Sequence, residues 1–167
     1  MPPDIRLDPL APSDFAAIEV LACTIWHEHY PAIISVAQID YMLAHKYTAQ
    51  QLALFVDGSD RWFEVLRVNG EMAGFVRCLR ESEREFKLVE IYLLQACRGR
   101  GLGRLMLDRA GQLANAAGCR SITLTVNRAN TSAIATYRRA GYVVRQACDF
   151  DIGHGFVMND YLMEKNV

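Results

Sequence analysis

The segment with the clearest chemical potential is residues 98–103, Arg-Gly-Arg-Gly-Leu-Gly, which separates an apolar run from an amphipathic one. A strand that gives way to a helix at such a point leaves free backbone N–H groups at the positive end of the helix dipole, where they can hold an anion. The glycines allow positive φ and a close approach of main chain to phosphate oxygens. Arg98, Arg100 and Arg104 add positive charge with forked donors. The segment therefore predicts a phosphate-binding loop.

Other uses of a glycine-rich loop fit less well. A dinucleotide-binding turn needs Gly-x-Gly-x-x-Gly and an acidic residue about twenty positions later. Here the spacing is Gly-x-Gly-x-Gly, and residues 119–123 contain no carboxylate. A nucleotide P-loop would need Gly-Lys-Ser/Thr, which is absent. A flexible turn without a ligand is the remaining alternative, and it leaves three arginines at one helix start unexplained.

A second motif follows downstream, Asn130-x-x-Ala133-x-x-x-Tyr137-x-x-x-Gly141-Tyr142. Together with Arg-x-x-Gly-x-Gly at positions 98, 101 and 103, it resembles the acetyl-CoA signatures of the GCN5-related N-acetyltransferase (GNAT) superfamily. The resemblance is clear over residues 87–144 and elsewhere extends only to the order of elements. Residues 152–161 are also similar to bacterial relatives of the PaiA polyamine acetyltransferases.

The resemblance implies acetyl-CoA as co-substrate, with its pantetheine arm lying against a central strand. One backbone N–H of that strand would polarise the thioester carbonyl, as in an oxyanion hole. Amides of residues 99–104 would hold the pyrophosphate, and Asn130 would bond the pantetheine arm, although it can also cap a helix. The implied cofactor-binding residues are Ile91, Tyr92, Leu93, Arg98, Gly99, Arg100, Gly101, Leu102, Gly103, Arg104, Asn130 and Tyr137.

The resemblance also suggests two catalytic residues, Tyr137 and Glu90. A tyrosine hydroxyl, with a reference pKa of about 10, can protonate the departing CoA thiolate. The alternative for Tyr137 is a core aromatic, since Ile134 and Ala140 share its helical spacing. An ammonium acceptor must lose a proton before it attacks, and Glu90 is the candidate base, directly or through water. Some relatives carry a Glu five positions before the motif Asn, but this chain has Thr125 there. Removal of the amine proton through a chain of water molecules, or without any side-chain base, therefore remains an alternative.

Acceptor recognition is expected from the N-terminal third, where Trp26, His27, Glu28, His29 and Tyr30 form a polar and aromatic cluster. The alternative is that the aromatic side chains pack in the core and the histidines face solvent, and the sequence does not favour either interpretation. The histidines lack ligand spacing with cysteines or carboxylates, so no metal is expected. The five scattered cysteines indicate reduced thiols in a cytoplasmic protein, and any role of Cys97 beside the loop stays open.

The surrounding sequence predicts the elements that position these residues. Helical spacing follows Ser13-Asp14 and Ser35, with Pro31 ending the first helix. Strands are expected at 62–68 and 72–79, joined by an Asn69-Gly70 turn, and at 87–94, which reads as a buried central strand. A helix then runs to Gly118. A strand at 121–126, a helix at 130–140 and strands at 142–151 and 156–163 complete the pattern.

This order predicts a mixed α/β (α+β) GNAT-like fold. The resemblance implies a mostly antiparallel sheet of six to seven strands, flanked by helices and splayed between strands 87–94 and 121–126. The 167 residues fit a single N-acetyltransferase domain. Its formal net charge of −1 argues against nucleic acid as a partner, and no apolar run approaches the roughly 18 residues of a membrane span. No signal peptide is expected. The sequence does not decide whether the protein forms a homodimer.

The expected function is transfer of an acetyl group from acetyl-CoA to a primary amine of a small molecule or peptide. A CoA-binding sensor or interaction module without catalysis is the alternative. The presence of both Tyr137 and Asn130 favours the enzyme. The sequence does not identify the amine.

Overall fold

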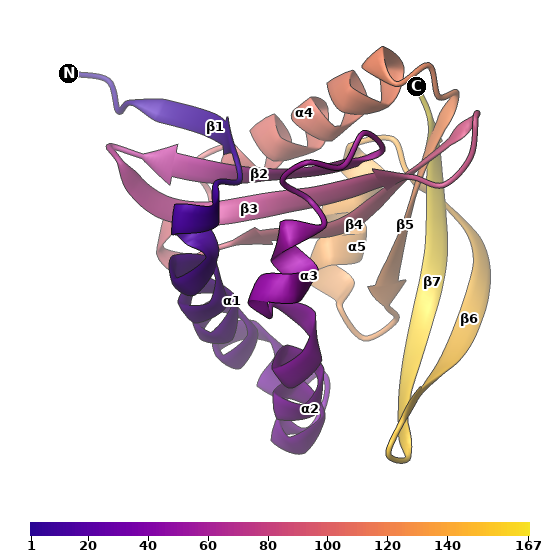
Figure 1. The fold of residues 1–167 in the computed structure, drawn as a ribbon. Helices are drawn as coiled ribbons and strands as arrows, with labels where there is room; N and C mark the ends of the chain where they lie inside the picture. Colours follow the sequence, from indigo (N-terminus) through magenta and orange to yellow (C-terminus); the bar gives the residue numbers. More distant parts are fainter.

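The computed structural model describes residues 1–167 and is built around one seven-stranded sheet with helices on both faces (Figure 1). In chain order the elements are β1 (Ile5–Pro9), α1 (Phe15–His29), α2 (Val36–Lys46), α3 (Ala49–Ala53), β2 (Arg61–Val68), β3 (Glu71–Arg80), β4 (Glu85–Leu93), α4 (Leu102–Ala116), β5 (Ser121–Asn127), α5 (Thr131–Arg139), β6 (Val143–Gly153) and β7 (Phe156–Asn166).

The strands lie in the order β1-β2-β3-β4-β5-β7-β6, and only the β4–β5 pair is parallel. That pair is also the shortest in the sheet, because only residues 85–87 pair with 121–123. Beyond Lys87 the two strands separate, and the rest of β4 has a partner on its β3 side alone. The predicted fold class is confirmed, including the splay. The separation leaves backbone groups of β4 unpaired in the middle of the sheet.

Alternating side chains along β2 and β3 supply two cores, one on each face of the sheet. Phe63 and Phe75 pack with α1, α2 and α3, whereas Leu66 and Val76 pack with α4 and α5. This period of two is the pattern expected of strands covered on both faces. Both cores therefore brace the strands that lead to the split between β4 and β5.

The N-terminal third departs from the predicted all-helical pattern. Residues 5–9 form β1, an edge strand beside β2, and the short alternation of apolar and charged residues in Ile5-Arg6-Leu7-Asp8 is the signal that could have predicted it. The short helix α3 is also additional, and Thr48 caps it by accepting a hydrogen bond from Gln51 N at 3.3 Å. None of the helices has the length and hydropathy that a bilayer crossing requires.

The predicted helix boundaries hold with two corrections. The Ser35 hydroxyl caps α2 by accepting from Gln38 N at 3.1 Å, as expected. Asp14 does not cap α1 with its side chain, because its carboxylate accepts from Ala11 N and pairs with Arg67 at 2.7 Å. The first helix ends at His29, and a short 3-10 turn follows that contains Pro31.

Candidate functional site

The glycine-rich loop presents a row of unused backbone donors. Six consecutive amides, from Gly99 to Arg104, donate to no acceptor in the protein, and the first satisfied amide is that of Leu105, which donates to Gly101 O at 3.1 Å. Gly99 and Gly101 hold positive φ of 73° and 78°, which turns the chain into α4. No side chain caps this helix. Such a row at the positive end of a 15-residue helix is suited to an anion.

Open space faces these donors. A Cβ atom added to Gly99, Gly101 or Gly103 would meet no other atom within 4 Å. The glycines are therefore not required by contacts with the rest of the protein. The loop residues fit a pyrophosphate, since they offer both hydrogen-bond donors and room for its oxygens.

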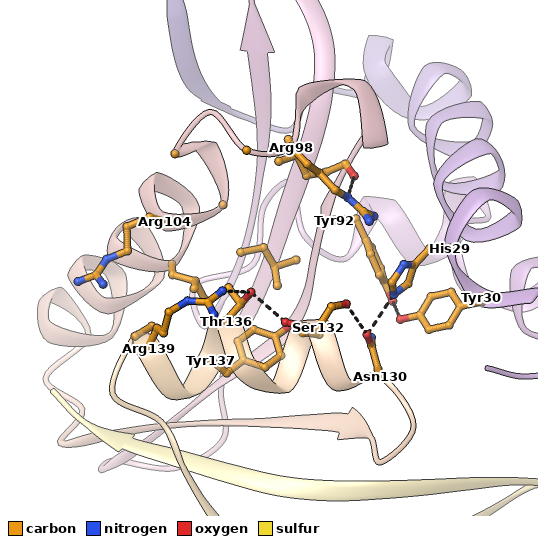
Figure 2. Close-up of a pocket in the computed structure, with 18 residues that line it drawn as sticks. His29, Tyr30, Tyr92, Arg98, Arg104, Asn130, Ser132, Thr136, Tyr137 and Arg139 are labelled. Carbon is orange, nitrogen blue, oxygen red and sulfur yellow. Dashed lines mark hydrogen bonds between the residues drawn. The ribbon is translucent and has the colours of Figure 1, made fainter. Parts of the chain in front are cut away.

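A cavity of about 600 Å³ runs from this loop along β4 to α5 (Figure 2). Its volume is in the range of small-molecule and cofactor sites. Ile91, Tyr92 and Leu93 line it from β4, and Asn130 and Tyr137 line it from the start and middle of the α5 segment. The first cavity thus brings together the two sequence motifs, which are separated in the chain by α4 and β5.

The arginines of the loop take different directions (Figure 2). Arg98 turns back into the first cavity, where its Nε donates to Leu93 O at 3.3 Å. Arg104 is directed away from the other labelled residues and pairs with Asp108 at 2.9 Å. Arg100 does not line the cavity, and the Leu102 side chain is buried in the α4 core. Arg104 also lines the cavity, but its guanidinium is turned away, so Arg98 is the one of the three whose charged group turns into the cavity.

Sequence reasoning missed three polar residues of α5 that line the first cavity. Arg139 extends into it, and its Nη2 donates to Thr136 Oγ1 at 3.2 Å (Figure 2). Ser132 lies nearer the start of the helix and bonds Asn130. Helical spacing from Ala133 and Tyr137 could have placed Thr136 on the same face. Arg139 follows Thr136 by three residues, so the same spacing could have placed it at the end of this face.

A second cavity, of about 440 Å³, lies on the other side of the split, between β4, β5, β7 and helices α1 and α2. The two cavities share five lining residues: Tyr30, Ile91, Tyr92, Asn130 and Tyr137. A molecule bound in one cavity can therefore meet a molecule bound in the other where β4 and β5 have separated. This junction is the candidate reaction centre.

Tyr137 belongs to both cavities, and its hydroxyl makes no hydrogen bond to the protein. Its ring packs on the α4–α5 core and lies 6.0 Å from that of Tyr142, so the core-aromatic interpretation describes the ring, and the general-acid role of the hydroxyl stays a prediction. Burial raises the pKa of Tyr137 well above its ordinary value. The hydroxyl is therefore protonated and free to donate at neutral pH.

Aromatic side chains from the end of α1 form one wall of the junction. Tyr30 Oη lies 3.2 Å from Tyr92 Oη, and the ring of Trp26 is 4.8 Å from that of Tyr30. Burial raises the pKa of Tyr30 to about 12. Of the predicted cluster at residues 26–30, Trp26 and Tyr30 line the second cavity. His27 instead bonds Asp40, and Glu28 is exposed.

His29 and Asn130 connect α1 to α5 across the first cavity, with His29 Nε2 3.2 Å from Asn130 Oδ1 (Figure 2). Burial and the nearby Arg98 charge lower the pKa of His29, so a neutral ring donates to the amide oxygen. Asn130 is the N-cap residue of α5, but its side chain makes no capping hydrogen bond. Helix capping therefore does not account for Asn130.

Glu90 lies in the second cavity, where one oxygen of its carboxylate, Oε1, makes two ion pairs. One extra residue in β4 between the pairs Arg77–Glu90 and Cys78–Leu88 rotates Glu90 to the α2 side of the sheet. There Lys46 Nζ lies at 2.5 Å and Arg77 Nη2 at 2.9 Å, and only 1% of the Glu90 side chain is exposed. These ion pairs lack hydrogen-bond geometry. Protonation of Glu90 would leave two cations unpaired, so this arrangement is poorly suited to a base.

Comparison with known proteins gives a consistent result. A family model described as the acetyltransferase (GNAT) family matches residues 22–142. The fold is similar to that of the PaiA N-acetyltransferase from Thermoplasma acidophilum in complex with coenzyme A, with a TM-score of 0.85, 21% identity and coverage of 98% of this chain and 99% of that one.

Two sequence relatives match the chain more locally. Streptothricin acetyltransferase of Streptomyces lavendulae is 29% identical over 52% of this chain and 46% of that protein. An uncharacterized N-acetyltransferase of Methanocaldococcus jannaschii is 34% identical over 48% of this chain and 38% of that protein. The chain thus spans less than half of the length of these two relatives.

Proposed function

This chain belongs to the acetyltransferase (GNAT) family, and from that premise we propose that it transfers the acetyl group of acetyl-CoA to a primary amine by direct attack. The observation that carries the proposal is the junction of the two cavities at Tyr137. The first cavity begins at the row of free amides, and the second opens towards helices α1 and α2. A donor and an acceptor can therefore approach one another from opposite sides of the sheet.

The donor's position follows from the unused backbone groups. The amides of residues 99–104 hold the pyrophosphate, with Arg98 and Arg139 as the cations that face the first cavity. The pantetheine arm lies along the unpaired side of β4, beside Ile91, Tyr92 and Leu93, and bonds Asn130. This placement brings the thioester to the junction, where one N–H of β4 polarises its carbonyl.

The acceptor enters from the second cavity as a neutral amine and attacks the thioester carbon. The carbon–sulfur bond breaks, and Tyr137 donates its proton to the leaving sulfur while the nitrogen loses its surplus proton. The raised pKa of Tyr137 does not oppose this transfer, because the same apolar surroundings also raise the proton affinity of the thiolate. Glu90 is left as part of the ion cluster with Lys46 and Arg77.

Acetyl-CoA binding should be visible in thermal unfolding. At 100 times its dissociation constant, a ligand that binds only the folded state stabilises it by about 2.7 kcal/mol. For a protein of this size, that stabilisation corresponds to a rise in Tm of roughly 5–10 °C. NAD is the control, because it carries a pyrophosphate but no pantetheine arm to pair with β4. A shift with NAD and none with acetyl-CoA would instead favour a dinucleotide site.

A further inference from the structure

Asp160, on β7, is a buried carboxylate of the second cavity that has no partner. The residue is 6% exposed, and its Oδ1 atom is buried without a hydrogen bond. No ion pair reaches it, in contrast to Glu90 in the same cavity, which has two. A buried carboxylate without a partner is costly to the fold and calls for an explanation.

The charged groups around the second cavity are otherwise paired. Lys46 of α2 is engaged by Glu90 of β4, and Lys87 of β4 is engaged by Glu81. Arg128, whose charge also acts on Asp160, is paired with Asp149 of β6. The remaining titratable groups that face the cavity are the hydroxyls of Tyr30, Tyr92 and Tyr137. Asp160 is thus the one charged side chain lining this cavity that takes part in no ion pair.

Burial raises the pKa of Asp160, and the charges of Lys46 and Arg128 oppose that shift only in part. The surroundings that the protein itself provides therefore disfavour the charged carboxylate. A bound cation would reverse this, since an opposite charge at close range favours the ionised form. A positively charged ligand would supply the partner that the protein does not give Asp160.

The rest of the cavity defines the remainder of that ligand. Most of its lining residues are apolar or aromatic, and those nearest α1, α2, β6 and β7 are Trp26, Tyr30, Ile34, Met42, Phe150, Ile152 and Met158. Aromatic and methionine side chains pack well on a hydrocarbon or aromatic chain and tolerate a nearby cation. A carboxylate on the ligand next to its ammonium group would meet Asp160 and be repelled.

We propose that Asp160 is the acceptor-binding carboxylate, which holds the ammonium group of a primary amine in the second cavity and takes its first proton. The acceptor class is a primary amine on an apolar or aromatic chain, with no carboxylate beside the amine. This inference rests on the proposed acetyl transfer, because it assigns the acceptor side of the same junction.

The protons balance as follows. Asp160 takes one proton from R–NH₃⁺, and the neutral nitrogen forms its bond to the thioester carbon. The carbon–sulfur bond breaks, Tyr137 protonates the sulfur, and the second proton leaving the nitrogen restores the Tyr137 hydroxyl. The products are the N-acetylated amine and free CoA thiol, and Asp160 returns its proton to solvent.

The test uses the Asp160→Asn variant with phenethylamine as acceptor. We expect kcat/KM for phenethylamine to fall about a hundredfold at pH 7, the lower end of general-base effects, with acetyl-CoA affinity unchanged. The loss should shrink towards pH 9, where the neutral amine is about a hundredfold more abundant. Asp151→Asn is the matched control, because Asp151 is exposed on the neighbouring strand β6 and outside both cavities.

The acceptor class is tested with phenylalanine, which adds a carboxylate beside the same amine. Wild-type protein that acetylates phenylalanine as well as phenethylamine, or does not acetylate phenethylamine, overturns the assigned class. An Asp160→Asn variant with wild-type kcat/KM overturns the role of Asp160 alone, since acetyl transfer itself would then stand. Failure of the wild type with every primary amine would instead refute the proposed function.

A stability measurement separates binding from a structural role. Because the folded-state pKa of Asp160 is raised, the ionised carboxylate destabilises the free protein at pH values above that pKa. Asp160→Asn should therefore raise Tm by about 2–4 °C at pH 7, and the gain should fade as the pH falls towards 4. A structural carboxylate would give a lower Tm in the variant at pH 7.

Discussion

Replacing Gly103 with valine is expected to weaken acetyl-CoA binding about a thousandfold while the fold stays intact. The added side chain projects into the open space that the pyrophosphate would occupy. Loss of two charge-assisted hydrogen bonds at about 2 kcal/mol each corresponds to a change of that size in Kd. Gly103 is preferable to Gly101, because Gly101 has a φ of +78° that valine would strain whether or not a ligand binds there. Calorimetric titration gives the affinity.

Gly111→Val provides the matched control for this experiment. Gly111 lies on the same helix, α4, and a Cβ atom there also meets nothing within 4 Å, but the residue is outside both cavities. Both variants replace a helical glycine with a residue of higher helix propensity, so their Tm values should be similar. Unchanged affinity in a folded Gly103→Val protein would contradict the assignment of the loop to pyrophosphate.

Replacing Tyr137 with phenylalanine should lower kcat by about 10²–10⁴-fold, the usual contribution of general acid catalysis. The ring keeps its packing beside Tyr142, and only the hydroxyl that faces the junction is lost. The KM for acetyl-CoA should change much less, because the proton is transferred only in the transition state. Steady-state kinetics with an amine that the wild-type protein acetylates measures both constants.

Tyr142→Phe is the control for the loss of a hydroxyl. Tyr142 is 3% exposed in the same core and does not line either cavity, so its variant should turn over like the wild type. A bound water that replaced the Tyr137 hydroxyl would reduce the loss towards tenfold without moving KM. Wild-type kcat in a folded Tyr137→Phe protein would rule out the general-acid role.

The parts of the site that lie close together in sequence could be predicted from it. The loop at 98–103 depends on glycines with positive φ and on the helix that follows, and both are local properties. The Asn69-Gly70 hairpin and the central strand could also be predicted, because each depends on local sequence. The splay beside β4 came from the family resemblance, since no local pattern encodes where two strands separate.

The residues on the acceptor side of the site are brought together by tertiary structure, so they could not be predicted from the sequence. Alternation along β4 would place Glu90 on the same face as Leu88, but the irregularity beside Arg77 turns it towards Lys46. Asp160 reaches the second cavity because β7 inserts between β5 and β6, a strand order that the chain sequence does not reveal. For the same reason, the bond between His29 and Asn130 joins residues that no motif connects.

The most direct test of acetyl transfer is to incubate the wild-type protein with acetyl-CoA and a panel of primary amines, and to measure free CoA thiol and N-acetylated amine in the same sample. The junction of the two cavities at Tyr137 predicts that both products form in a one-to-one ratio with at least one amine and that neither forms without enzyme. Thiol release without an acetylated amine, or no thiol release with any amine despite tight acetyl-CoA binding, would contradict the proposed acetyl transfer.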